Sequence, residues 1–238
     1  MLYGKTDNAY AGAFEQLYEW GVRLTERNNG FGYLRKDGRF FPISMLLIDS
    51  GHNATTVYDF THRWNYTFPS KGDRIIQPSK NSKNNRLHQS NYIPYKSSKV
   101  YGGTTLLYTI STKIYKKQLY QWLNIKRTSE EIQSAGFQEF PREYDLHYFD
   151  MLTAEEQTQD GEYTNRGRAN EGLDCRVYSM VGADIYLAQQ VELKREEYQG
   201  AGWTKRQVEQ IGSRWVIEYM ANKCGIDRRF METNRSKK

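Results

Sequence analysis

The sequence predicts a single α/β domain, and three observations support this prediction. Residues 43–48 (ISMLLI) form a short, continuous apolar run, which is typical of a strand buried on both faces in the middle of a sheet. Residues 53–64 follow with Val57 and Phe60 at helical spacing. Further strand and helix patterns then alternate along the chain, which indicates an α/β fold. The 238 residues are enough to bury a full core in one domain.

The other elements are predicted from the same two periodicities and from turn residues. Gly38, in an Asp-Gly turn, predicts a hairpin within residues 30–43. Leu173, Val177, Val181 and Leu187 recur on one side of a helix. We expect helices over residues 9–26, 113–123, 145–156, 171–190 and 204–223, strands over 66–70, 104–110 and 136–140, and a loop over 160–169.

Charged residues fall into two opposite blocks. Residues 70–127 contain twelve Lys or Arg and one acid, whereas residues 128–174 contain twelve acids and three Arg. A positive block suits the phosphate backbone of a nucleic acid, and an acidic block suits divalent cations. Either block alone is compatible with a solvated face, but together they favour phosphate chemistry. Residues 73–100, rich in Ser, Asn and Lys, predict a long basic loop that becomes ordered on DNA.

The composition argues against several classes of protein. No apolar run approaches the roughly 20 residues of a membrane helix, and the first residues do not have the pattern of a signal peptide. Cys175 and Cys224 are the two cysteines, which indicates reduced thiols rather than a disulfide scaffold. Together with four scattered His, they give no zinc-binding spacing.

Asp49 is the first candidate for the chemistry. It ends the apolar strand and is followed by Ser50 and Gly51. Open α/β sheets place their ligands at the C-terminal ends of strands. Asp49 is therefore either a solvated residue at the sheet edge or a ligand, and a second carboxylate beside it would favour a ligand.

Glu171 and Asp174 are the second candidates. They are i, i+3 neighbours at the start of a predicted helix, so they share one helix face. Favourable interaction with the helix dipole accounts for Glu171. Asp174 lies beside the core position Leu173, and a buried acid without a partner costs several kcal/mol. A metal ion shared with Asp49 would offset that cost.

Four stretches of the sequence carry a resemblance to a known family. They are LLIDSGHNATTVYDF, FPSKG, FPREYDLHYFDMLTAEEQ and GRANEGLDCRVYSMVGADIYL. Their order and spacing, between residues 45 and 188, resemble the nuclease domain of phage large terminase subunits of the lambda (GpA) type. The combination of Leu-Thr-Ala-Glu with Asn-Glu-x-Leu-Asp-Cys is the most specific part of the match.

The resemblance implies an RNase H-like (RuvC/integrase-like) fold with a central mixed sheet flanked by helices. It implies an endonuclease that cuts double-stranded viral DNA during genome packaging with two Mg²⁺ or Mn²⁺ ions. The implied partners are double-stranded DNA, the packaging ATPase domain of the same chain, the small terminase subunit and the portal, with no membrane. The implied location is the cytoplasm of the infected bacterial host, not the virion. We expect 1–238 to be one nuclease domain, with 73–100 as a flexible basic loop and 191–238 as a helical extension.

The sequence departs from the family pattern in three places. It has no Walker A motif, so we expect a fragment of a longer chain that carries the packaging ATPase. Ile110 stands where the family usually has an Asp. Glu139 replaces the His of the family's His-Phe-Pro strand, and it is the candidate to supply the missing acid.

The family match implies a role for each candidate residue. Asp49 is expected to bridge both ions, and Asp174, Glu171 and Glu139 to complete their ligand shells, because hard cations prefer oxygen ligands. Lys71, otherwise an ordinary surface lysine, is expected to contact a phosphate or the transition state. The residues expected to bind the DNA backbone are Lys71, Arg74, Lys80, Lys83, Arg86, Lys113, Lys116 and Lys117.

Two other functions are compatible with these residues. A resolvase or transposase-type nuclease with an RNase H-like fold would use the same acids, and preferential cutting of junctions would distinguish it. A non-catalytic DNA-binding module would use the acids only to cap helices, and it would bind DNA without metal-dependent cutting.

Overall fold

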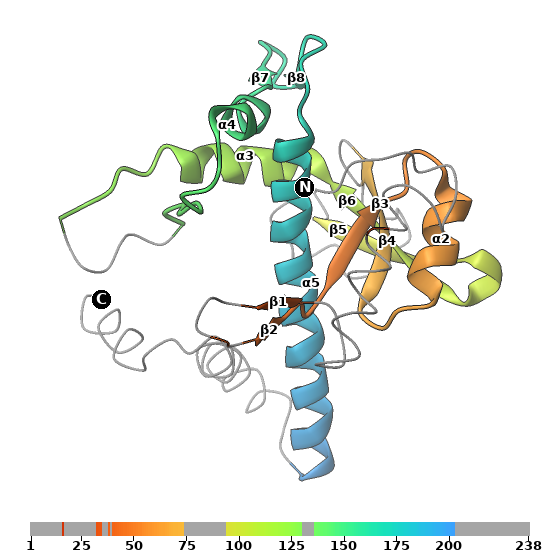
Figure 1. Cartoon of the computed structure of the whole chain (residues 1–238). Coiled ribbons are helices and arrows are strands. Elements are labelled where there is room, and N and C mark those ends of the chain that lie inside the picture. The colour runs from red at the N-terminus through yellow and green to blue at the C-terminus, as the bar shows by residue number, and fades with distance from the viewer. Residues whose placement is uncertain are drawn as a thin grey trace. The chain divides into compact units, whose positions relative to one another are not determined.

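The computed structural model of the chain describes residues 16, 32–34, 38, 40–73, 94–129 and 136–202 (Figure 1). By its internal contacts the chain divides into two compact units, residues 1–121 with 140–182 and residues 122–139 with 183–238. The helices predicted over 9–26 (apart from Gln16, which is helical) and over 204–223 lie outside the described residues, as do residues 74–93 of the predicted basic loop.

A four-stranded mixed sheet forms the centre of the first unit. Its strands are β3 (Leu46–Asp49), β4 (Thr67–Asp73), β5 (Tyr95–Val100) and β6 (Thr105–Ser111), in the order β3-β4-β6-β5. The first three in that order run parallel, and β5 is antiparallel to β6. Asp49 pairs with Ser70 and Asp73 with Ser111, so the carboxyl ends of the parallel strands share one edge of the sheet. The prediction of an α/β fold with a mixed sheet is confirmed.

The sequence predicts β3 in the middle of the sheet. Among the described strands, β3 instead lies at one edge, next to β4. Its apolar character comes from helices on both of its faces. Ile48 packs against Val57 and Phe60 of α2 (Ala54–His62). A Cβ added at Gly182 of α5 (Glu171–Gly200) would lie 3.8 Å from Leu47. Helical cover on both sides therefore produces the same apolar run as a central position would.

The long helices of the first unit confirm their predictions, as does the hairpin before β3. α2 buries Val57 and Phe60, and α3 (Thr112–Leu123) buries Tyr115 and Leu119. The hairpin pairs β1 (Gly32–Leu34) with β2 (Phe40–Pro42), and Gly38 has a φ of +82°. Within the part of the chain that the structure describes, no helix is both long and apolar enough to cross a membrane.

α5 extends beyond its predicted end at residue 190 and continues from the first unit into the second. Leu173, Val177 and Val181 are fully buried along one side of it, as their spacing predicts, and Leu187 is partly buried. The first ten residues of the predicted 191–238 extension therefore belong to α5, and residues 203–238 lie outside the described residues.

Four shorter segments differ from their predictions. Residues 95–100 form β5 instead of a loop, because pairing with β6 defines a strand whose own residues are polar and mostly exposed. Residues 136–140 form a turn and an irregular segment rather than a strand. α4 (Leu146–Leu152) is shorter than predicted and is capped by Asp145, which accepts the N–H of Tyr148. β7 (Glu156–Gln157) pairs with β8 (Tyr163–Thr164), so part of the predicted 160–169 loop is a hairpin.

A glycine allows α4 to pack closely against the start of α5. A Cβ added at Gly172 would lie 3.1 Å from the Cβ of Met151 and 3.3 Å from the carbonyl oxygen of Tyr148. Gly172→Ala is therefore expected to destabilise the fold by about 1–3 kcal/mol through overpacking. Gly182→Ala, where the added Cβ makes only ordinary contacts, is the matched control in the same helix and should gain up to about 1 kcal/mol of helix propensity. Urea unfolding measures both, and equal free energies of unfolding for the two variants would contradict close packing at Gly172.

Candidate functional site

Asp49 lies at the exposed carboxyl end of β3 and is held by two hydrogen-bond donors. The N–H of Gly51 donates to its Oδ1 at 3.3 Å, and the hydroxyl of Tyr178 on α5 donates to the same oxygen at 3.0 Å. Ser50, which lies between Asp49 and Gly51 in the sequence, is buried. Its N–H and its hydroxyl both donate to the carbonyl of Ser70. Burial and the neighbouring Asp49 carboxylate raise the pKa of Tyr178, so its hydroxyl remains a donor. Two donors from different segments thus hold Oδ1 of the Asp49 carboxylate.

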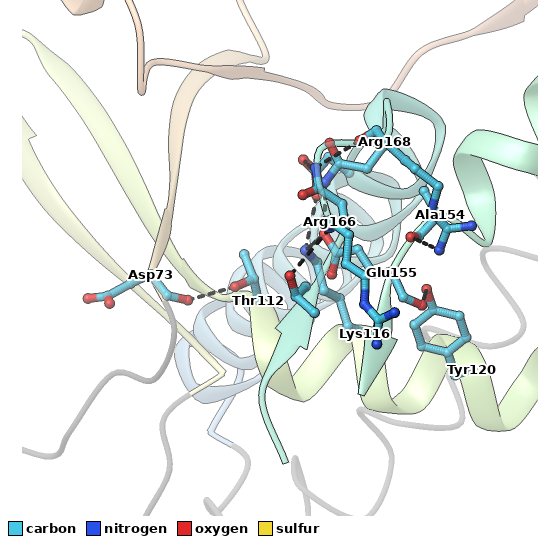
Figure 2. Close-up of polar contacts among 12 residues, drawn as sticks. Asp73, Thr112, Lys116, Tyr120, Ala154, Glu155, Arg166 and Arg168 are labelled. Atoms are coloured by element: carbon cyan, nitrogen blue, oxygen red, sulfur yellow. Dashed lines mark hydrogen bonds and ion pairs between the residues drawn. The ribbon is translucent and has the colours of Figure 1, made fainter. Parts of the chain in front are cut away.

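Glu155 follows α4 and is the most deeply buried acid of the site, with 8% of its surface exposed. Its Oε1 accepts the ammonium of Lys116 at 2.6 Å and the side-chain amide of Asn170 at 2.8 Å (Figure 2). Its Oε2 is buried and has no hydrogen-bond partner among the described residues. Buried polar atoms are normally paired, so this oxygen is suited to a cation.

Asp174 lies beside Glu155, in the first turn of α5. The ammonium of Lys116 is 3.4 Å from its Oδ1, and the amide of Asn170 is 3.3 Å from its Oδ2. Burial raises the pKa of Asp174; Lys116 lowers it, and the carboxylates of Glu155 and Asp49 raise it. Asp49, Glu155 and Asp174 therefore come from three segments, and the carboxylates of Asp49 and Glu155 both act electrostatically on Asp174.

Several contacts hold the segment around Glu155 in place. The hydroxyl of Tyr120 donates to the backbone carbonyl of Glu155 at 3.0 Å, and its ring stacks on Tyr163 of β8. Burial, followed by the nearby Glu155 carboxylate, raises the pKa of Tyr120 to about 12. Arg168 donates to the carbonyl of Ala154 and forms an ion pair with Glu156 (Figure 2). The position of Glu155 thus depends on α3 and on the loop before α5.

The structure does not bring Glu171, Glu139 or Lys71 into the contacts that join Glu155 and Asp174 among the described residues. Glu171 is exposed on the first turn of α5. Glu139 is exposed and belongs to the second unit. Lys71 is exposed within β4, two residues before the end of that strand. His52, in the turn after Asp49, is also exposed.

The basic residues predicted on α3 have three different environments. The ammonium of Lys113 pairs with Glu162 at 2.8 Å. Lys116, with 12% of its side chain exposed, faces Glu155 and Asp174. Lys117 is exposed. The remaining predicted backbone contacts, Arg74, Lys80, Lys83 and Arg86, lie outside the described residues.

Sequence reasoning did not single out Glu155, Asn170 or Tyr178. Glu155 closes the Leu-Thr-Ala-Glu stretch and follows Ala154, which is fully buried. Asn170 opens the Asn-Glu-x-Leu-Asp-Cys stretch, and Tyr178 lies one helical turn after Asp174. The first two could have been found as polar residues at fixed places in these motifs. Cys175, also in that motif, is an exposed free thiol.

The donor set is suited in kind to a hard divalent cation. Carboxylate oxygens are the ligands that Mg²⁺ and Mn²⁺ prefer, and Glu155 offers one that is buried and unpartnered. Among the described residues no three His, Cys, Asp or Glu side chains stand close enough to form a ready-made metal site. Lys116 instead supplies the positive charge between Glu155 and Asp174.

The fold and the site define an α/β domain with an acidic site at the carboxyl edge of its parallel strands, the usual place of ligand sites in open α/β sheets. The chain matches the family described as terminase large subunit gpA, endonuclease domain, over residues 15–196, and it belongs to this family. No curated protein and no solved structure matches the chain. Family membership supports a DNA-packaging endonuclease of phage type.

Proposed function

We propose that this domain is a metal-dependent endonuclease that cuts double-stranded viral DNA during genome packaging. Membership of the terminase endonuclease family supports the reaction class. The observation that carries the proposal is the buried, unpartnered Oε2 of Glu155 in a cluster with Asp174. A buried carboxylate oxygen of this kind is expected where a cation binds.

Asp49, Glu155 and Asp174 are the residues proposed to hold two Mg²⁺ or Mn²⁺ ions, with Glu171 as a further proposed ligand and Glu139 as the alternative to Glu155 for the middle acid. Such ions, when bound, activate a water molecule and stabilise the leaving 3′ oxygen. The chain's own residues prepare the site. Lys116 and Asn170 hold Glu155 and Asp174 side by side, and the Asp-Ser-Gly turn holds Asp49 at the sheet edge.

We also propose the finer features that the family match implies. An RNase H-like fold is supported by parallel strands with Asp49 at the carboxyl end of one of them and helices beside the sheet. Exposed Lys71 and Lys117 are proposed to bind the DNA backbone together with Arg74, Lys80, Lys83 and Arg86. From the same family membership we propose three partners, which are a packaging ATPase domain, the small terminase subunit and the portal, and we propose that they meet in the host cytoplasm.

The test is a cutting assay on supercoiled plasmid. The purified protein is expected to nick and linearise the plasmid with Mg²⁺ or Mn²⁺, and EDTA is expected to stop the reaction, because the acids alone do not activate water. Replacing EDTA by its Mg²⁺ complex is the control for chelator effects. Cutting that persists in EDTA would contradict metal dependence. Faster cutting of four-way junctions than of linear duplex would favour a resolvase, and DNA binding without any cutting would favour a non-catalytic module.

A further inference from the structure

We propose that Tyr178 is a positioning residue for Asp49: its hydroxyl occupies Oδ1 of the carboxylate and leaves Oδ2 to bind a divalent cation. The proposal rests on the proposed function, because it assigns Tyr178 to the same metal site. It concerns a residue that acts through Asp49 and has no part of its own in the chemistry.

The first step concerns the helix that carries Tyr178. Asp174 and Tyr178 are i, i+4 neighbours on α5, so they lie on one face of the helix, one turn apart. Asp174 joins the cluster around Lys116, and Tyr178 reaches Asp49 at the end of β3. One rigid helix therefore supplies a carboxylate and also the donor that holds a carboxylate from the sheet. The position of Asp49 relative to Asp174 therefore depends on α5, which carries Asp174 and, through Tyr178, holds Asp49.

The second step concerns the two oxygens of Asp49. Both donors that reach its side chain from the described residues, the Tyr178 hydroxyl and the Gly51 N–H, bind Oδ1. Two donors on one oxygen restrict rotation of the carboxylate about its χ2 bond. A Cβ at Gly51 would lie 3.2 Å from Oδ2, so this glycine keeps the space beside the second oxygen open. The arrangement presents Oδ2 in a defined direction.

The third step concerns the place of the Tyr178 hydroxyl in the sheet edge. A Cβ added at Gly72 of β4 would lie 3.5 Å from this hydroxyl and 3.0 Å from the Cγ2 of Thr112. The hydroxyl therefore lies at ordinary contact distance from Gly72 of β4 while it donates to Asp49 at the end of β3. The closer approach of Thr112 is the contact that favours a glycine in the Lys71-Gly72 pair. Outer-shell hydrogen bonds of this kind orient metal ligands, and their loss typically weakens metal binding or activity about 10–100-fold.

Tyr178→Phe tests the proposal, because it removes the hydroxyl and keeps the ring. We expect Mn²⁺ binding, measured by calorimetry, to weaken about 10–100-fold. We expect kcat for plasmid cutting to fall and KM for DNA to stay within about twofold, because Tyr178 is proposed to act through Asp49 and not through a contact with DNA. Tyr58→Phe on α2, whose ring contacts Tyr101, is the matched control and should leave Mn²⁺ affinity unchanged.

A double-mutant cycle separates positioning from simple stabilisation of the fold. In an Asp49→Asn background, Tyr178→Phe should cause no further loss of Mn²⁺ affinity, because the ligand that it holds is already absent. Equal Mn²⁺ affinity for wild type and Tyr178→Phe, or losses that add in the double variant, would overturn this inference alone. A wild-type protein that binds no Mn²⁺ would overturn the metal site and the role of Tyr178 together.

Discussion

Asp49→Asn is expected to abolish metal-dependent plasmid cutting while the protein remains folded. The substitution keeps the size of the side chain and removes the charge that a divalent cation requires. Asp49 is exposed, and among the described residues its carboxylate accepts hydrogen bonds from Gly51 and Tyr178 alone, so little of the fold depends on its charge. Losing about 4 kcal/mol of transition-state stabilisation corresponds to a rate loss of about 10³-fold.

Asp174→Asn should cause a loss of the same order, because Asp174 shares the site through Lys116 and Asn170. Asp150→Asn, an exposed acid on α4, is the matched control and should cut at the wild-type rate. Rates are compared by gel quantification at saturating Mn²⁺, and circular dichroism verifies the fold. Either site variant cutting as fast as wild type would remove that residue from the proposed site.

Glu155→Gln is expected to reduce cutting about 10²-fold or more and to weaken Mn²⁺ binding with it. Glu155 is almost completely buried and has one carboxylate oxygen without a partner, whereas Glu139 is exposed in the second unit. Glu139→Gln is therefore the matched comparison and should cut within about twofold of wild type if Glu155 supplies the middle acid. The two rates and the two Mn²⁺ affinities are measured side by side.

A loss of stability must be separated from a loss of a ligand in the Glu155 variant. Removing one member of a buried ion pair costs about 3–5 kcal/mol, and Lys116 would remain beside Asp174 alone. Glu155→Asp keeps the charge and shortens the reach, so it should retain more stability than Glu155→Gln and still lose most cutting. Thermal unfolding distinguishes the two effects. A strong effect of Glu139→Gln with a weak effect of Glu155→Gln would assign the middle position to Glu139.

The interpretation of Lys116 changes once its neighbours in the structure are known. From sequence it belongs to a basic helix with Lys113 and Lys117, and such a helix predicts contacts with a DNA backbone. In the structure its ammonium lies between two carboxylates, and only Lys117 of the three is exposed. The periodicity of α3 defines which side of the helix each lysine occupies, but not what lies opposite. Only the packing of α3 against Glu155 and the start of α5 decides that.

Features that depend on one segment could be predicted from the sequence alone. Helical spacing is a local property, so α2 and the buried side of α5 follow from their own residues. The end of an apolar run is also local, and it places Asp49 at the carboxyl end of β3. The family motifs likewise consist of short stretches, which is why membership of the terminase endonuclease family could be predicted before the fold was known.

Features that depend on two distant segments were decided only by the tertiary structure. β5 is polar and exposed, so no pattern of its own marks it as a strand, and its pairing with β6 defines it. Tyr178 donates to a residue 129 positions earlier in the chain, and Glu155 is joined to Lys116 across 39 positions. A carboxylate gains its function from neighbours that desolvate and orient it, and those neighbours come from other elements. The sequence therefore determined the longer helices, the end of β3 and the family, and the packing of α3, α4 and α5 at the sheet edge decided which side chains meet in the site.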